Sequence, residues 1–92
     1  MTDATDERND LSESIIEIVR EALILDPGAA ARVNMDSSFI EDLGIDSLTM
    51  VRIDMLVQAK LGLAVPPDEV VRIDRVSDLV DLLITHGEPV RD

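Results

Sequence analysis

Apolar residues recur at helical spacing in the first third of the chain. They occupy positions i, i+4, i+7, i+8 and i+11, namely Leu11, Ile15, Ile18, Val19 and Ala22, and this spacing places them on one face of a helix. Asp10, followed three residues later by Glu13, has the form of a capping box. We therefore expect a helix from Asp10 to about Leu25. Pro27 disfavours helical geometry at the residue before it and ends the element.

Residues 47–61 are apolar on nearly every side. The apolar positions are Leu48, Met50, Val51, Ile53, Met55, Leu56, Val57, Ala59 and Leu61. We predict a second long helix from Ser47 to Leu61, with Gly62 as its C-terminal stop. A helix with so little polar surface is either largely buried or keeps part of its surface for a partner.

A third helical pattern lies near the C-terminus. Val76, Leu79, Val80 and Leu83 follow the i, i+3, i+4, i+7 spacing, which predicts a helix from about Val76 to Thr85. Before it, Pro66 and Pro67 fix an extended entry, after which Asp68 or Glu69 begins one short helical turn. The chain shows no alternating strand pattern. We therefore expect an all-α fold, a small four-helix bundle of three longer helices and one short helix.

The connection over residues 28–45 is longer than most loops in compact domains, so it is either functional or held by packing. Its apolar residues are expected to enter the core, and these are Phe39, Ile40, Leu43 and Ile45. The stretch "AAARV" within it is expected to hold a short turn of helix. We divide the chain into a disordered acidic arm over residues 1–9, a folded domain over residues 10–86 and a flexible C-terminal tail over residues 87–92.

The composition removes several functional classes. The chain of 92 residues is one domain by length, and its lack of cysteine excludes disulfides, a thiolate nucleophile and cysteine-ligated metals. A net charge of −12 repels nucleic acid and anionic lipid and favours partners with basic surfaces. No apolar run reaches the ~20 residues that cross a bilayer, and the acidic N-terminus is unlike a signal peptide. We expect a cytoplasmic protein that binds no nucleic acid and does not insert into membranes.

Ser47 is the residue with the most chemical interest. A catalytic serine needs a base, and the single histidine, His86, ends the last predicted helix, where we expect it to be exposed. The pairs Asp42 with Asp46 and Asp78 with Asp81 lack the pattern of a calcium loop and have no histidine nearby, so they predict no metal site. The structural alternative is that Asp46 caps the helix and Ser47 merely occupies its first turn. The same helix end would also favour a phosphate attached to Ser47.

The segment "FIEDLGIDSLTMV" closely resembles the modification site of acyl carrier proteins. The resemblance continues through "LGLAVPPDEV" and "VSDLVDLL" and covers roughly residues 11–85, so residues 10–86 would form an acyl-carrier-like domain. It implies that a phosphopantetheinyl transferase, using coenzyme A and magnesium, attaches 4′-phosphopantetheine to Ser47. The arm ends in a thiol that holds acyl groups as thioesters. The attached group would thus supply the reactive sulfur that a chain without cysteine lacks. The implied protein is a monomeric carrier and not an enzyme, served by an acyltransferase or acyl-activating enzyme and by a ketosynthase or other pathway enzymes.

Departures from the family pattern indicate a specialised pathway. Carriers of fatty-acid synthesis are rich in acids along this helix, whereas residues 47–61 hold only Asp54 against Arg52 and Lys60. This difference favours polyketide or other specialised biosynthesis. Partner contact is expected from Asp46, Leu48, Met50, Asp54, Met55, Asp68 and Glu69, although the two methionines fit ordinary core filling equally well. Arg75 stands where the family often has threonine, so the cap of the last helix is expected at Asp74.

Two other functions remain open from the sequence. A peptidyl or aminoacyl carrier shares the fold and the serine but more often has a glycine pair before the D-S step, so "LGIDSL" favours the acyl type. A non-carrier helical interaction module would use Ser47 only as a helix-start residue. Met1 and the acidic arm favour a free-standing protein.

Overall fold

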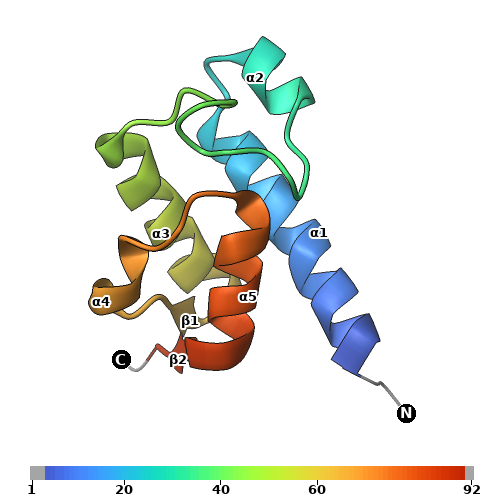
Figure 1. The fold of residues 1–92 in the computed structure, drawn as a ribbon, viewed down its shortest axis with the longest axis vertical. Helices are drawn as coiled ribbons and strands as arrows, with labels where there is room; N and C mark the ends of the chain where they lie inside the picture. The colour runs from blue at the N-terminus through green and yellow to red at the C-terminus, as the bar shows by residue number, and fades with distance from the viewer. Residues whose placement is uncertain (1–3, 91–92) are drawn as a thin grey trace.

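The computed structural model describes residues 4–90, and helices dominate it (Figure 1). The elements in chain order are α1 (Ala4–Ala22), α2 (Pro27–Ala31), α3 (Ser47–Leu61), β1 (Leu63–Ala64), α4 (Pro67–Val70), α5 (Val76–His86) and β2 (Glu88–Pro89). Three helices are long, as predicted, so the all-α bundle is confirmed. The structure adds to it α2, a helix of five residues that includes part of "AAARV", and a two-stranded antiparallel sheet. None of the described helices has the length and apolar character needed to cross a membrane.

The first helix begins earlier than its sequence pattern indicates. α1 starts at Ala4 and not at Asp10, so residues 4–9 are helical, and the prediction of a disordered arm is wrong for them. Arg8 forms an ion pair with Asp81 of α5, which ties this polar part of α1 to the bundle. Residues 1–3 lie outside the described residues. The helix also ends at Ala22, three residues before the predicted end, because the chain turns towards α2.

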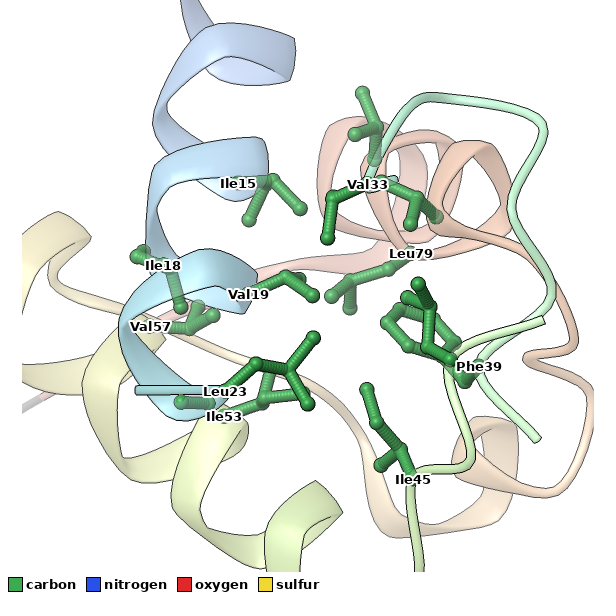
Figure 2. Close-up of a cluster of buried hydrophobic side chains, with 14 of the residues drawn as sticks. Ile15, Ile18, Val19, Leu23, Val33, Phe39, Ile45, Ile53, Val57 and Leu79 are labelled. Atoms are coloured by element: carbon green, nitrogen blue, oxygen red, sulfur yellow. The ribbon is translucent and has the colours of Figure 1, made fainter. Parts of the chain in front are cut away.

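α1 and α5 bury the faces that their periodicity predicts, and α3, which is apolar on nearly every side, buries one part of its surface (Figure 2). α1 contributes Ile15, Ile18, Val19 and Ala22, α3 contributes Ile53 and Val57, and α5 contributes Val76, Leu79, Val80 and Leu83. Burying one such aliphatic side chain stabilises the fold by about 1.5–3 kcal/mol. Because aliphatic side chains dominate this core, its stability comes from helix-on-helix packing.

The connection from α2 to α3 supplies the remaining part of the core. Phe39 is 2% exposed, and Leu43 and Ile45 are each 3% exposed, so these three residues are confirmed as core residues. The prediction for Ile40 is wrong, because its side chain is 71% exposed. Phe39 and Ile40 both lie in the turn over residues 39–43, and of these two neighbours only Phe39 is buried.

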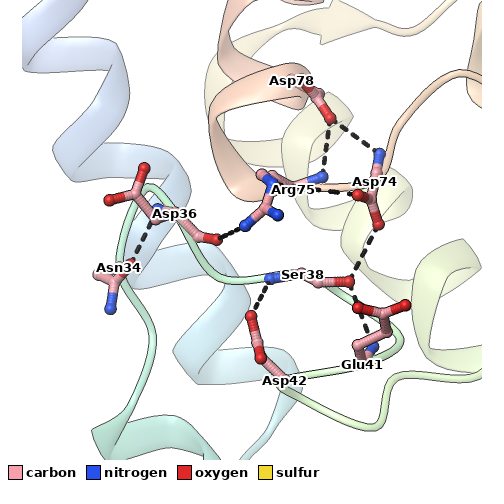
Figure 3. Close-up of polar contacts among 8 residues, drawn as sticks. All are labelled: Asn34, Asp36, Ser38, Glu41, Asp42, Asp74, Arg75 and Asp78. Atoms are coloured by element: carbon pink, nitrogen blue, oxygen red, sulfur yellow. Dashed lines mark hydrogen bonds and ion pairs between the residues drawn. The ribbon is translucent and has the colours of Figure 1, made fainter.

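Hydrogen bonds tie this connection to the start of α5 (Figure 3). The Phe39 amide donates to the Asp74 carbonyl at 2.8 Å, and the Val76 amide donates to the Ser37 carbonyl at 3.0 Å. The buried Ser38 hydroxyl donates to the Asp74 carboxylate at 3.0 Å and accepts from the Glu41 amide at 3.2 Å. The connection is therefore an ordered part of the fold.

The same contacts decide how α5 is capped. The Asp74 carboxylate is engaged by Ser38, so Asp74 is not the cap that we expected. Arg75 holds the cap position instead, and Asp78 Oδ2 supports it by accepting the Asp74 amide at 3.0 Å and the Arg75 amide at 2.8 Å. A side chain three residues inside a helix commonly reaches back to the amides before it in this way.

The C-terminal segment is paired where we expected a flexible tail. Pro89 lies opposite Leu63 and Glu88 opposite Ala64 in the β1–β2 sheet, and the Val90 amide donates to the Gly62 carbonyl at 2.9 Å. Residues 88–90 therefore fold back onto the end of α3, and the prediction of a flexible tail is wrong for them. Residues 91 and 92 lie outside the described part of the chain.

Candidate functional site

The start of α3 is capped by the residue that precedes it. Asp46 has extended backbone geometry, with φ −90° and ψ 178°, and its carboxylate accepts the Thr49 amide at 2.8 Å. The Asp46 carbonyl accepts the Met50 amide at 3.0 Å. The Thr49 amide stabilises the charged carboxylate and so lowers the pKa of Asp46 below its ordinary value. Asp46 is thus confirmed as the helix cap.

Ser47 is the first residue of α3 and is exposed. The chain reaches it through Gly44, whose φ of 64° lets the backbone turn between the buried residues Leu43 and Ile45. The Ile45 amide donates to the Phe39 carbonyl at 2.8 Å, which fixes the segment just before the cap. The first amides of a helix have no intrahelical partner, and the helix dipole adds positive potential there. Ser47 is therefore presented to solvent where an attached anion is favoured.

No catalytic base accompanies Ser47 in the described part of the chain. His86 is exposed, as predicted, and closes α5 at the end of the bundle opposite the start of α3 (Figure 1). The Asp42 carboxylate accepts the Ser38 amide at 2.7 Å, so Asp42 braces the connection (Figure 3). Within residues 4–90 no group of three or more His, Cys, Asp or Glu side chains is arranged to hold a metal ion.

A cavity of about 480 Å³ opens beside Ser47. Small-molecule sites in proteins have volumes of about 300–1,000 Å³, so the cavity has the size of a ligand site. Apart from Asp46, Ser47 and Asp54 its lining is apolar. The apolar lining comprises Phe39, Ile40, Ile45, Met50, Val51, Ile53, Val57, Val65, Val70, Val71, Ile73 and Leu79. The arrangement offers an exposed hydroxyl at the mouth of an apolar space.

Known proteins resemble the chain over most of its length. The family described as "Phosphopantetheine attachment site" matches residues 13–83, which include α3 and the whole cavity lining. The acyl carrier protein of Tropheryma whipplei (strain Twist) is 36% identical over 77 residues, which cover 84% of this chain and 90% of the relative. That of Clostridium acetobutylicum is 33% identical over 76 residues, with 83% and 95% covered. The chain belongs to the acyl carrier protein family. The acyl carrier protein of Rickettsia typhi is also similar, with 39% identity over 70 residues, which cover 76% of this chain and 78% of the relative.

An acyl carrier protein is not an enzyme but a covalent carrier. It bears 4′-phosphopantetheine and interacts with a phosphopantetheinyl transferase and with acyl-handling enzymes. The arm, once attached, supplies the thiol that holds acyl groups as thioesters. The start of α3 fits this group, because Ser47 is exposed, the amides there lack helical partners, and the cavity beside it is apolar. The family and the cofactor predicted from the sequence are confirmed.

The predicted partner-contact residues on this carrier's α3 separate into two sets. Leu48 and Met55 are 75% and 64% exposed, so they are available to a partner. Met50 and Asp54 are half-buried and line the cavity together with the exposed Asp46. Met50 also packs against the core, which matches the core-filling interpretation of this methionine.

The predicted contact residues on α4 lie close to two residues that sequence analysis missed. Asp68 is exposed, whereas Glu69 is half-buried and forms an ion pair with Arg72 at 3.6 Å. Val70 and Val71 follow them and line the cavity although they are 42% and 86% exposed. Two adjacent valines in the otherwise charged stretch "DEVVR" were the signal available in the sequence.

Proposed function

We propose that Ser47 is the residue to which 4′-phosphopantetheine is attached, and that the arm presents acyl intermediates to partner enzymes. The observation that carries this proposal is the exposed Ser47, first in α3 and at the mouth of the apolar cavity. A phosphodiester on its hydroxyl would lie at a helix N-terminus, where negative charge is stabilised. The cavity would take up an apolar acyl chain, because burial removes it from water.

Intact mass measurement tests the attachment site. The apo-protein, incubated with coenzyme A, magnesium and a broad-specificity phosphopantetheinyl transferase, is expected to gain the mass of one arm. Ser47→Ala should abolish this gain completely. Ser77→Ala is the matched control, because Ser77 lies in the first turn of α5 as Ser47 does in that of α3, and it should be modified like the wild type. A wild-type chain without an adduct, or an adduct on Ser47→Ala, would contradict the proposal.

We further propose that the pathway is polyketide or other specialised biosynthesis. The support lies in the charges on α3, where Arg52 and Lys60 are exposed and Lys60 pairs with Glu21 of α1 at 3.0 Å. Asp54, the one acid in this helix, is half-buried in the cavity wall and bonded to Gln58. The surface that α3 offers a partner is thus apolar and basic, unlike the acidic helix that basic enzymes of fatty-acid synthesis would match.

Reversing one charge tests this choice of partners. Arg52→Glu should raise the rate of transfer between the loaded carrier and fatty-acid-synthesis enzymes by about tenfold, because a favourable charge contact of roughly 1.4 kcal/mol corresponds to that factor. Arg20→Glu makes the same change of net charge on α1 instead of α3 and should leave the rate unchanged. Equal rates for wild type and Arg52→Glu would remove the charge argument.

Partner contact is assigned to Leu48, Met55, Asp46, Asp68 and Glu69, with Met50 and Asp54 reassigned to the cavity. The partners are the transferase, an acyltransferase or acyl-activating enzyme, and a ketosynthase or other pathway enzymes. The carrier binds them as a monomer in the cytoplasm.

Loading by acyl-activating and by aminoacyl-activating enzymes separates the acyl carrier from a peptidyl carrier. The names of the relatives support the acyl type.

A further inference from the structure

Asp54 is a feature of the cavity that the carrier role leaves unexplained. Its Oδ2 accepts a hydrogen bond from the Gln58 side chain at 2.9 Å, and Gln58 is not part of the cavity lining. Its Oδ1 is buried and receives no hydrogen bond from the residues that the structure describes. The other polar lining residues, Asp46 and Ser47, are exposed at the start of α3. Asp54 therefore lines an apolar cavity while one oxygen of its carboxylate is buried and has no donor.

A carboxylate in this place has an energetic cost for the empty cavity. Buried acceptors without a donor destabilise a fold, and nearly all buried polar groups in proteins have a partner. The neighbouring lining residues on α3 are Met50, Ile53 and Val57, which supply no donor side chain. An apolar residue at position 54 would complete this wall without the cost. A group that enters the cavity and donates a hydrogen bond to Asp54 would remove the cost of the unpaired acceptor.

The position of Asp54 along α3 suits a group tethered at Ser47. The two residues are seven positions apart, which is close to two helical turns, so they share one face of the helix. At 1.5 Å of rise per residue they are separated by about 10 Å along the helix axis. A chain that starts at Ser47 and follows α3 into the cavity therefore passes Asp54.

We propose that the cavity selects tethered groups that carry a hydrogen-bond donor, an O–H or an N–H, and that the Asp54 carboxylate accepts it once rotation about its Cβ–Cγ bond turns the unpaired oxygen towards the cavity. This inference rests on the attachment of the arm to Ser47 proposed above. Asp54 would then be a specificity determinant for the cargo, favouring hydroxylated acyl chains over fully apolar chains of equal length. The donor can come from two sources, because the arm carries amide N–H groups and a hydroxyl of its own.

A matched set of loaded proteins tests the proposal. The transferase is given coenzyme A, octanoyl-coenzyme A, or hydroxyoctanoyl-coenzyme A isomers with the hydroxyl near, midway and far from the thioester. Each product is checked by intact mass, and its Tm and the carboxyl ¹³C shift of Asp54 are compared with those of the apo-protein. The set is repeated with Asp54→Val, which removes the acceptor, and with Asp54→Asn, which retains an acceptor oxygen and the size of the side chain.

The acyl chain supplies the donor if the Tm of at least one hydroxyoctanoyl form is higher than that of the octanoyl form by about 4–8 °C. One net hydrogen bond implies a difference of this size for a domain of this length. The Asp54 carboxyl shift should move with it, and the Tm difference should vanish in Asp54→Val. The arm itself supplies the donor if the holo-protein already has a higher Tm than the apo-protein, if this difference requires Asp54, and if the acyl hydroxyl adds no further increase. The first result supports the proposal, and the second overturns the selection of cargo because it places the donor on the arm. Because each Tm is referred to the apo form of the same variant, a purely structural role of Asp54 cancels.

Two further outcomes overturn the inference and are distinct from each other. Wild-type protein that loads on Ser47 but shows no Asp54-dependent difference among the cargoes overturns the selection alone, as expected if bound water satisfies Oδ1 equally well. Protein that acquires no arm overturns the attachment proposal and this inference together. If Asp54→Val does not fold, the comparison rests on Asp54→Asn and on the wild-type carboxyl shift, where an unchanged shift in every loaded form counts against the proposal.

Discussion

Asp46 and Ser47 are neighbours with separate tasks at the start of α3. The Asp46 carboxylate caps the helix by accepting the Thr49 amide at 2.8 Å. The Ser47 hydroxyl is therefore not needed as the cap. A serine at the cap position itself would turn its oxygen towards the helix amides. The order of the two residues thus keeps the hydroxyl accessible to a modifying enzyme.

The lowered pKa of Asp46 predicts a specific dependence of stability on pH. Because the pKa is lower in the folded than in the unfolded state, the cap stabilises the fold fully above the unfolded value of about 3.9. This contribution is lost as the pH falls through the folded pKa. Asp46→Ala should therefore be less stable than wild type at neutral pH, and the difference should shrink in acid. Urea unfolding between neutral pH and about pH 2 measures it.

Asp46→Asn is the matched control for this measurement. Asparagine caps helices about as well as aspartate but does not titrate, so its advantage over Asp46→Ala should be the same at every pH. A wild-type advantage over Asp46→Ala that stays constant into acid would contradict the assignment of the charged carboxylate as the cap.

At the scale of elements, α3 and the segments that flank it act as one unit. The helix stops at Gly62, whose φ of 66° lies in the left-handed region and whose amide donates to the Gln58 carbonyl. The stop turns the chain into β1, and the Gly62 carbonyl then accepts the Val90 amide from the other end of the chain. The conformation of one glycine therefore links α3 with the C-terminal segment.

Substituting Gly62 should reveal this conformational requirement. Gly62→Ala is expected to destabilise the fold by about 1–2 kcal/mol, because a side chain disfavours left-handed geometry. Open space surrounds the position that an added Cβ would take, so no steric clash contributes. Gly28→Ala in α2 has no positive φ and should be neutral or stabilising by up to about 1 kcal/mol. Midpoints of urea unfolding compare the two, and equal losses would show that φ at Gly62 is unimportant.

At the scale of the whole molecule, the connection between α2 and α3 joins the core to the site. Phe39 lies in the core and also lines the cavity, and its amide and carbonyl bind Asp74 and Ile45 respectively (Figure 2). Ser38 holds the same segment to Asp74 through its side chain. The position of the α3 start thus depends on contacts with the beginning of α5.

Removing the Ser38 hydroxyl tests this dependence. Ser38→Ala leaves the Glu41 amide without its acceptor and the Asp74 carboxylate without its donor, so a loss of about 1–3 kcal/mol in unfolding free energy is expected. Amide hydrogen exchange should also accelerate over residues 37–46. Ser14→Ala on α1 removes a hydroxyl without touching the connection and should change neither measurement. Unchanged exchange in Ser38→Ala would refute this role.

Local signals were sufficient for the elements that local interactions form. The bounds of α3 were predicted correctly because its cap, Asp46, and its stop, Gly62, act within a few residues of the helix ends. The buried faces of α1 and α5 followed from periodicity alone. Ser47 could be proposed as the attachment residue because its motif is contiguous in the chain.

Only the tertiary structure decided features whose partners are distant in the sequence. The start of α1 at Ala4 accompanies the ion pair of Arg8 with Asp81, and the pairing of Glu88 and Pro89 requires β1. The exposure of Ile40 and the unpaired Asp54 oxygen follow from how the packed chain encloses the cavity. The sequence by itself determined the helices, their core faces and the serine motif, because contacts within about four residues specify them. Packing determined the cavity and left one Asp54 oxygen buried without a donor, because both features exist only once distant segments meet.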